Sequence, residues 1–495
     1  MCVVRGSFAE NTMFLDDLEK IKVQCRVLCF GIIIFIELQF QCIAFSSLSR
    51  IQQPFKALSK MSTVTSSNTE SKNKNTNISN EANMSFLHSS NPAHDTGAGF
   101  YNKKMTLGRD LAVLAAVAQQ SFLNASLSSC SCQKKSSLSK QRPYRLLDAF
   151  SGVGALALRL SKALDVSTTQ ITANDRSPTC FNLIAQNVAS NNITNVIAAN
   201  QDVNVNLTID AVNPEQRPYD FIHLDPFGCV VPYLDCAFRD LPGGSILSFT
   251  STDVTALYDR RYKNVAKRHY TCELHEPRDP NTYRETAVRM ILSAVASSAG
   301  RNGKGIQVLL SCAVEHFILI QVRVVRGSVG ADNSMKCVNL MKVGIQGRQA
   351  VCSSGSTSSD VTVTEGPLWT GRLGCSQWCN QLLDIAKSTE LGCSKKKIMK
   401  LLNTLSKEMA EDMQEAYYFT RVQSIVKELH LDAEPRRDDV IQELLKMGVN
   451  ACSTHFDPHS IKMAENRTFL VDAVKNVRSR SIQKKALLSH SIGTR

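Results

Sequence analysis

Four short apolar segments of this chain each end at an aspartate, and the four aspartates are spaced almost evenly along the sequence. The segments are RLLDAF, QITAND, VIAANQD and YDFIHLD, and their acids are Asp148, Asp175, Asp202 and Asp225, which lie 27, 27 and 23 residues apart. Each interval has about the length of one strand–helix–strand unit. Helix-like sequence fills the intervals, so the pattern predicts a parallel, doubly wound α/β sheet. All four carboxylates then fall at the carboxyl edge of the sheet, where open α/β folds bind ligands.

The turn after the first predicted strand carries Gly152 and Gly154 in the sequence SGVGALALRL. It matches the loose G-x-G-x-x-G/A pattern of dinucleotide-binding turns, and Asp175 follows about 20 residues later, where such folds bind a ribose. A nicotinamide enzyme would show the same pattern. Glycines also serve a tight turn that binds nothing. The turn alone therefore does not decide between these interpretations.

Residues 306–325, IQVLLSCAVEHFILIQVRVV, contain two long strands with only a short break, so these strands must pair antiparallel. A parallel sheet that ends in such a hairpin is typical of class I S-adenosylmethionine-dependent methyltransferases and not of dehydrogenases. In that fold we expect Asp175 to bind the ribose hydroxyls and Asp202 the adenine amino group. Asp148 and the glycine turn are expected to face the methionine part of the cofactor.

The fourth strand runs into Asp225, Pro226, Phe227 and Gly228, a loop that resembles the D-P-P-Y type that methylates exocyclic amino groups on bases. Such an amine is a poor nucleophile because its lone pair is delocalised into the ring. A carboxylate can accept its proton as the nitrogen attacks. Proline fixes the backbone so that a carbonyl can orient the second N–H, and Phe227 offers a face for stacking the base. The alternative is a strand-end turn in which Asp225 only caps the next helix.

Several further blocks make the chain similar to the tRNA (guanine-N2)-dimethyltransferases. They are GFYNKKMTLGRDLAV, TSTDVTALY, YRETAVRMIL, GPLW and STHFDPHSIK, in addition to LDPFG. The resemblance covers residues 97–330 well and 365–470 more patchily. Within the family, FIHLDPFG, RHY and EHF most resemble the metazoan tRNA methyltransferase 1-like branch.

The resemblance implies an enzyme that adds one or two methyls from S-adenosylmethionine to N2 of a guanine at the hinge between the D-arm and the anticodon arm of tRNA, at position 26 or its neighbour. It assigns Asp225 as the base, Phe227 as the stacking ring and Phe100 to the active site. Arg109 would contact the cofactor. Arg159 is the one arginine that remains of the two that normally follow the glycine turn, and it is also predicted to bind the cofactor.

Two alternatives stay open. Leu156 replaces the first arginine of that turn, which is compatible with a catalytically weak paralog kept as a tRNA-binding or chaperone module. Methylation of another acceptor, such as adenine in DNA, is a remote option that the blocks outside the core argue against.

A zinc site is not expected from the cysteines of the C-terminal part. Many relatives carry a Cys-x-x-Cys pair and a second pair downstream. Here Cys337 and Cys352 stand alone, and Cys375 and Cys379 are spaced C-x3-C with no close second pair. Tetrahedral zinc needs four convergent ligands, so the sequence predicts no metal.

The balance of charge favours a polyanionic partner. The 495 residues carry a formal net charge of +13, and such an excess suggests nucleic acid before a membrane surface. Candidate contacts with tRNA phosphates are Arg260, Arg261, Lys263, Lys267, Arg268, Lys395 to Lys397 and the tail from Lys475 to Lys485. No membrane association and no obligate protein partner are expected. The 17 cysteines, mostly single and in apolar context, suit a reducing compartment, and we expect a nuclear, nucleolar or mitochondrial protein.

Composition divides the chain into four predicted parts. Residues 1–93 are expected to be a leader and a disordered segment, with Met61 as a possible start of translation. The apolar run from Val27 to Phe45 is interrupted by polar residues and is too short to span a bilayer. Residues 94–328 are predicted to form the methyltransferase domain, 329–470 a family-specific C-terminal α+β domain that binds RNA and carries degenerate zinc-like cysteines, and 471–495 a basic tail.

Overall fold

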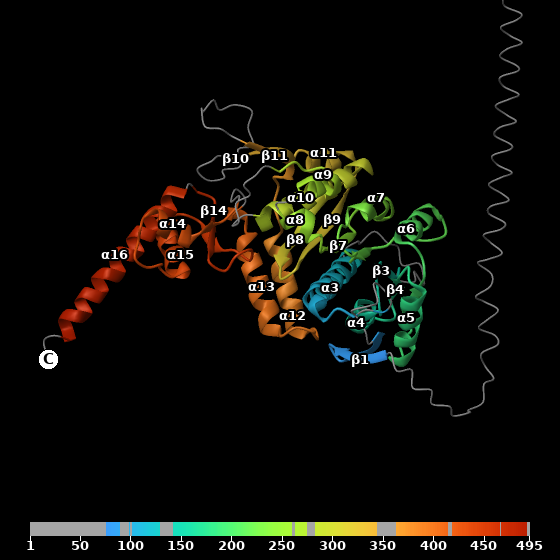
Figure 1. The fold of residues 1–495 in the computed structure, drawn as a ribbon. Coiled ribbons are helices and arrows are strands. Elements are labelled where there is room, and N and C mark those ends of the chain that lie inside the picture. The colour runs from blue at the N-terminus through green and yellow to red at the C-terminus, as the bar shows by residue number, and fades with distance from the viewer. Residues whose placement is uncertain are drawn as a thin grey trace, which may run out of the picture. The chain divides into compact units, whose positions relative to one another are not determined.

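A seven-stranded sheet lies among the helices of the described part of the chain (Figure 1). The computed structural model describes residues 76–89, 99, 101–128, 142–259, 263–274, 283–343, 363–413, 418–465 and 467–492. The strands of the sheet are β3 (Tyr144–Asp148), β4 (Thr169–Asn174), β5 (Val196–Ala199), β6 (Phe221–Leu224), β7 (Ile246–Ser251), β8 (Lys304–Val314) and β9 (Phe317–Arg326). Their order is β5-β4-β3-β6-β7-β9-β8; the first five are parallel, and β9 runs antiparallel to both neighbours. The predicted α/β methyltransferase sheet with its terminal hairpin is confirmed.

Helices cover both faces of this sheet, and the strands therefore carry apolar residues on both sides. Leu146, Phe221 and Ile246 pack in one core cluster, while the next residue of each strand packs in the other. The first cluster includes α3 (Thr106–Ser128), α4 (Ala155–Ala163), α5 (Pro178–Ser190), α12 (Ser376–Ser388) and α13 (Lys395–Glu408). The second includes α6 (Val203–Val212), α7 (Val231–Asp240), α8 (Val254–Tyr258), α9 (Lys263–Tyr270) and α10 (Tyr283–Arg301). Consecutive residues of each strand enter opposite core clusters because successive side chains of a strand point to opposite faces of the sheet.

Local capping fixes where two helices begin at the carboxyl edge of the sheet. Ser177 caps α5, its hydroxyl accepts a hydrogen bond from the Cys180 N–H, and Pro178 occupies the first turn. Asp202 caps α6 in the same way. Both are residues that favour helix starts, because a side-chain oxygen satisfies a backbone N–H that has no partner within the helix. The turns between strand and helix are therefore held in fixed positions at the edge where a ligand would bind.

The expectation that residues 1–93 are a leader and a disordered segment is wrong for residues 76–89. They form an antiparallel hairpin of β1 (Thr76–Glu81) and β2 (Met84–Ser89). Met84 and Phe86 are buried against Leu158 of α4 and Leu183 of α5. Only these two apolar residues alternate inside a mainly polar sequence, so the strand pattern was too short to be recognised.

The predicted boundary at residue 329 is also wrong, because described residues beyond it, from Met341 to Met409, pack into the two core clusters of the methyltransferase fold. The hairpin of β10 (Val338–Val343) and β11 (Val363–Trp369) follows α11 (Ser328–Met335) and buries Met341, Leu368 and Trp369. Trp378 and Leu382 of α12 are buried beside α3. The apolar faces of α12 and α13 thus extend the main core. Two short 3-10 helices, Lys103–Met105 and Glu411–Met413, lie before α3 and after α13 respectively.

A separate small core begins at Val422. Its elements are β12 (Thr420–Arg421), α14 (Val422–Glu428), α15 (Arg437–Lys446), β13 (Ala451–Ser453), β14 (Ser460–Met463) and α16 (Arg467–Ile492), and the three strands pair in the order β12-β14-β13. The predicted boundary at residue 470 falls inside α16, where Leu470, Ala473 and Val474 are buried. The start of the expected basic tail is therefore part of this core.

The apolar run from Val27 to Phe45 and the possible start at Met61 lie outside the described residues. Among the helices that the structure describes, none combines the length and apolar character needed to cross a bilayer.

Candidate active site

A cavity of about 930 Å³ lies at the carboxyl edge of the sheet. Residues of the loops that follow β3, β4, β5 and β6 line it, and they include all four strand-end aspartates, Asp148, Asp175, Asp202 and Asp225. The structure thus brings together the four carboxylates, as predicted from their spacing. A cavity of this size is typical of cofactor sites.

Asp148 is the most buried of the four carboxylates. Ser151 donates a hydrogen bond to its Oδ2 at 2.6 Å. Burial raises the pKa of Asp148 to about 7, and the nearby negative charge of Asp225 also raises it, whereas the Ser151 hydrogen bond acts in the opposite direction. A positively charged group in the cavity would favour the ionised form of this carboxyl.

Asp175 is fixed between the glycine turn and α5. Its Oδ2 accepts from the Gly152 N–H at 2.9 Å, and its Oδ1 accepts from the Ser177 N–H at 2.8 Å. A carboxylate can accept about four hydrogen bonds, so Asp175 retains acceptor capacity on the cavity side. Asp202 also lines the cavity, and its Oδ1 accepts a hydrogen bond from the Asn204 N–H at 3.0 Å.

The two glycines of the turn have different positions. Gly152 lines the cavity and has φ of +56°, a conformation that favours glycine. Gly154 has φ of +84°, and a Cβ there would lie 3.0 Å from Leu158 Cδ1. Gly154 is the N-cap residue of α4 and shapes the start of that helix, and it does not line the cavity as predicted.

The structure corrects the prediction for Arg159. This side chain is buried away from the lining of the cavity, where its Nη1 donates to Glu81 Oε1 at 2.5 Å and its Nη2 to Asp110. Arg109 does line the cavity, and its Nε and Nη2 donate to the two oxygens of Glu81 at 2.9 and 2.5 Å. Arg159 therefore belongs to a buried ion network, while Arg109 lies at the edge of both the network and the cavity.

Glu81 joins this network to the rest of the site, and sequence analysis missed it. It lies at the end of β1, in the segment expected to be disordered, 28 residues before Arg109 and 78 before Arg159. Tyr101 also lines the cavity, and its hydroxyl donates to Glu81 Oε2 at 2.5 Å. Such separations leave no local pattern in the sequence. Only the folded hairpin reveals that Glu81 positions Arg109.

We expect Glu81→Gln to lower the free energy of unfolding by about 3–5 kcal/mol, because it removes the charge that compensates two buried guanidinium groups. Burial favours a raised pKa for Glu81, but the hydrogen bond and charge of Arg109, together with Arg159, lower this pKa from 4.5 to about 2. The contribution of Glu81 to stability is therefore present above pH 4.5 and is lost as pH falls towards about 2.

Urea unfolding at neutral and acidic pH measures both effects. Glu390→Gln is the matched control, because Glu390 forms an exposed ion pair with Lys162, and its variant should unfold at the same urea concentration as the parent chain. Equal stability of Glu81→Gln and the parent at neutral pH would contradict the account of the network.

The loop after β6 brings the predicted base and ring to the cavity. Asp225 is half-buried, and the Thr250 hydroxyl of β7 donates to its Oδ1. Phe227 is 86% exposed and lies in the cavity lining. The Gly228 N–H donates to Thr252 Oγ1 at 3.0 Å, which connects the end of the loop to the residue that follows β7. The geometry offers an oriented carboxylate and an accessible aromatic face side by side.

His223, which sequence analysis did not select, also lines the cavity. Its Nδ1 lies 3.1 Å from the Ser248 hydroxyl. Burial lowers the pKa of His223 to about 4, so the ring is neutral at physiological pH. The available signal was its place in the block FIHLDPFG, two residues before Asp225, and a buried core histidine is compatible with the same position.

The remaining predicted residues are placed as follows. Phe100 lies outside the described residues, and its assignment to the active site stays a prediction, although the next residues, Tyr101 and Asn102, line the cavity. Cys352 also lies outside the described residues. Within the part that the structure describes, Cys337, Cys375 and Cys379 belong to no group of three metal-ligating side chains.

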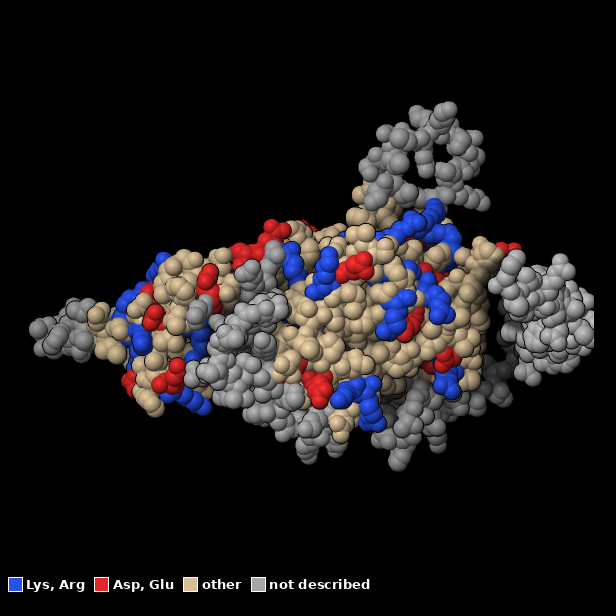
Figure 2. All heavy atoms as spheres, turned by 90° about the horizontal axis from the view of Figure 1, so that it is seen from above, with Lys and Arg blue, Asp and Glu red and all other residues tan. Residues whose placement is uncertain are grey.

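The predicted basic residues are only partly available for an anion. Figure 2 shows Lys and Arg in several separate groups on one face, with Asp and Glu between them. Lys267 of α9 pairs with Glu273 and Lys397 of α13 with Glu315, whereas Lys395 and Lys396 are exposed at the start of α13. Arg260 and Arg261 lie outside the described residues. Exposed pairs of this kind are weak, so phosphates could compete for these cations.

Comparison with known proteins agrees with this geometry. The family described as "N2,N2-dimethylguanosine tRNA methyltransferase" matches residues 75–475. A human protein named tRNA (guanine(27)-N(2))-dimethyltransferase is 33% identical over 311 residues, which are 55% of this chain and 39% of the human protein. A Thermococcus kodakarensis protein named tRNA (guanine(26)-N(2))-dimethyltransferase is 27% identical over 389 residues, 76% of this chain and 93% of that protein.

A solved structure described as a complex of Trm1 from Pyrococcus horikoshii with S-adenosyl-L-methionine has the same fold. It superposes with a TM-score of 0.65 and 22% identity, and covers 80% of this chain and 99% of that one. This chain spans about two fifths of the length of the human and macaque relatives that it matches.

Proposed function

Because this chain belongs to the N2,N2-dimethylguanosine tRNA methyltransferase family, we propose that it transfers one or two methyl groups from S-adenosylmethionine to the exocyclic N2 of a guanine in tRNA. The observation that carries the proposal is the cavity of about 930 Å³, in which four strand-end carboxylates meet the accessible ring of Phe227. The carboxylates suit a cofactor rich in hydroxyl, amino and cationic groups, and the ring suits a base.

The residues at the carboxyl edge of the sheet would each bind a different part of the cofactor. Asp175 accepts hydrogen bonds from two backbone N–H groups and retains capacity for the ribose hydroxyls. Asp202 would accept from the adenine amino group. Asp148 and Gly152 would face the methionine part, whose ammonium and sulfonium charges favour the ionised form of Asp148. The bound cofactor supplies an electrophilic methyl group on its sulfonium sulfur.

Asp225 would take the proton that the guanine amine loses as its nitrogen bonds to the methyl carbon and the bond from that carbon to the sulfonium sulfur breaks, which would leave a neutral thioether. The hydrogen bond from Thr250 holds one carboxylate oxygen and leaves the other for the amine. Neutral His223 adds no competing positive charge to Asp225. The target guanine must leave its stack to reach this carboxylate, and Phe227 offers the face on which it would stack.

We further propose that the target is a guanine at the hinge between the D-arm and the anticodon arm. Relatives of this chain are named for guanine 26 or guanine 27. Unmodified tRNA transcripts with adenosine at position 26, at position 27, or at both would be incubated with the purified chain and methyl-labelled cofactor. Loss of incorporation with one single replacement is the expected result, whereas full incorporation into the doubly replaced transcript would contradict this choice of target.

Phe227→Ala is expected to weaken tRNA binding by about 5- to 150-fold, since stacking of one base on an aromatic ring contributes about 1–3 kcal/mol. Turnover should also fall, although less than after loss of the base, because the path of the proton is intact. Fluorescence anisotropy with labelled tRNA measures the affinity, and Phe227→Tyr, which keeps an aromatic face, should restore most of it. Equal affinity of Phe227→Ala and the parent would show that the ring does not stack on the RNA.

A further inference from the structure

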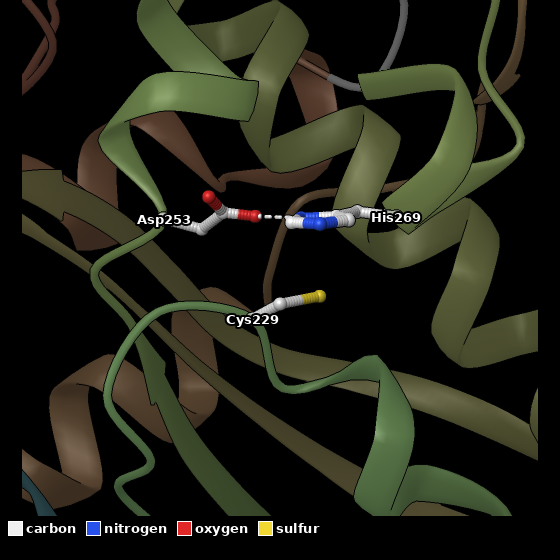
Figure 3. A group of neighbouring side chains, drawn as sticks. All are labelled: Cys229, Asp253 and His269. Atoms are coloured by element: carbon white, nitrogen blue, oxygen red, sulfur yellow. Dashed lines mark hydrogen bonds and ion pairs between the residues drawn. The ribbon is translucent and has the colours of Figure 1, made fainter. Parts of the chain in front are cut away.

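A second cluster of polar side chains consists of Cys229, Asp253 and His269 (Figure 3). Cys229 follows Gly228 in the loop after β6, Asp253 precedes α8, and His269 belongs to α9. One potential ligand atom of each lies within 4.8 Å of the other two. The three residues come from separate elements and meet at one point, which is how protein metal sites are usually assembled.

The orientation of Asp253 indicates that its carboxylate serves this cluster. Asp253 occupies the N-cap position of α8, where an aspartate normally accepts from a backbone N–H of the first turn, but it makes no such side-chain bond. Its Oδ2 instead accepts from His269 Nδ1 at 2.6 Å and from the Tyr270 hydroxyl at 3.2 Å. The Asp253 side chain therefore does not cap α8 and instead points towards His269 and Cys229.

We propose that Cys229, Asp253 and His269 form a zinc site. Thiolate sulfur, imidazole nitrogen and carboxylate oxygen are the ligand types that zinc prefers, and the two anionic ligands balance its charge. Tetrahedral ligands at zinc bond lengths lie roughly 3.3–3.6 Å apart, so side-chain shifts of about an ångström would bring the three atoms to one ion. The side chain of His269 is 36% exposed, and water can supply the fourth ligand from that side.

The ion would add to two hydrogen bonds that already attach the loop after β6 to the end of β7. The Gly228 N–H donates to Thr252 Oγ1, and the Gly228 carbonyl accepts from the Ser251 hydroxyl at 3.1 Å. A zinc–thiolate bond at Cys229 would connect the same loop to α9. The site therefore fixes the segment that presents Asp225 and Phe227, and its existence does not depend on the proposed reaction.

The pattern of the sequence hid this site. The prediction that the chain binds no metal rested on the cysteines of the C-terminal part. The ligands identified here are 24 and 16 residues apart and include only one cysteine. No C-x-x-C pair marks them, and only the packing of α9 against the end of β7 brings them together.

Metal analysis of the purified full-length chain tests the proposal. Inductively coupled plasma mass spectrometry should find about one zinc ion per chain, and the Cys229→Ser and His269→Ala variants should lose it. Cys236→Ser and His459→Ala are matched controls from outside the cluster and should keep it. After removal of zinc with a chelator, added cobalt(II) should give a thiolate charge-transfer band in the parent chain that is absent from Cys229→Ser.

Two outcomes would overturn the proposal. One is a purified chain that contains no zinc and, after treatment with chelator, takes up neither zinc nor cobalt. The other is zinc retained at the parent level in both ligand variants, which would place the ion elsewhere. The first outcome is measured on the unmutated chain alone, so it can overturn the proposal even if a ligand variant fails to fold.

Discussion

Asp225→Asn is expected to slow methyl transfer by about 10²–10⁴-fold, the usual contribution of a positioned acid or base. Asparagine keeps the size of the side chain and an oxygen that can accept from Thr250, but it cannot take the proton of the amine. Affinity for the cofactor and for tRNA should change little, because neither depends chiefly on this carboxylate. Single-turnover transfer to unmodified tRNA at saturating cofactor isolates the chemical step.

The matched control for this variant is Asp384→Asn, at an aspartate of α12 whose side chain is 73% exposed. It should transfer methyl groups at the parent rate. If Asp225→Asn also does so, the carboxylate only shapes the turn after β6 and is not the base.

Asp175→Ala is expected to lower the affinity for S-adenosylmethionine by about 10²–10⁴-fold. The estimate assumes two hydrogen bonds from the ribose hydroxyls to a charged acceptor, each contributing about 1.5–3 kcal/mol. The substitution also removes the acceptor for the Gly152 N–H at 2.9 Å, which should loosen the glycine turn in the same direction. Isothermal titration calorimetry measures the affinity directly.

Asp165→Ala provides the comparison for this variant, because Asp165 is an exposed aspartate in the loop before β4. Its affinity for the cofactor should equal that of the parent. Circular dichroism would establish that both variants are folded. Unchanged affinity in folded Asp175→Ala would mean that the cofactor does not bind at this edge of the sheet.

The sheet and the convergence of its four aspartates could be predicted because both follow from local, repeated features. Each strand is a short apolar run, each interval fits one helix, and the carboxyl ends of parallel strands must meet at one edge. The hairpin of β8 and β9 followed from the short break between two long apolar strands. These features depend on residues that are neighbours in the sequence.

The parts that were missed depend on contacts between distant residues. Glu81 lies in a mainly polar hairpin, and its partners are 28 and 78 residues away. Arg159 matched a family position, but the burial of α4 places it against Glu81 and Asp110 instead of in the cavity. The boundary near residue 329 failed because α12 and α13 carry apolar faces that complete the core around α3. A change in composition does not reveal which core a helix joins.

The most direct test of the proposed function is nucleoside mass spectrometry of unmodified tRNA after incubation with the purified chain and S-adenosylmethionine that carries a deuterated methyl group. We predict labelled N2-methylguanosine or N2,N2-dimethylguanosine, with the label lost in Asp225→Asn. Binding of tRNA without any labelled guanosine would indicate a binding module that does not catalyse transfer. Label on a different atom, such as the amino nitrogen of adenine, would contradict the account of the acceptor.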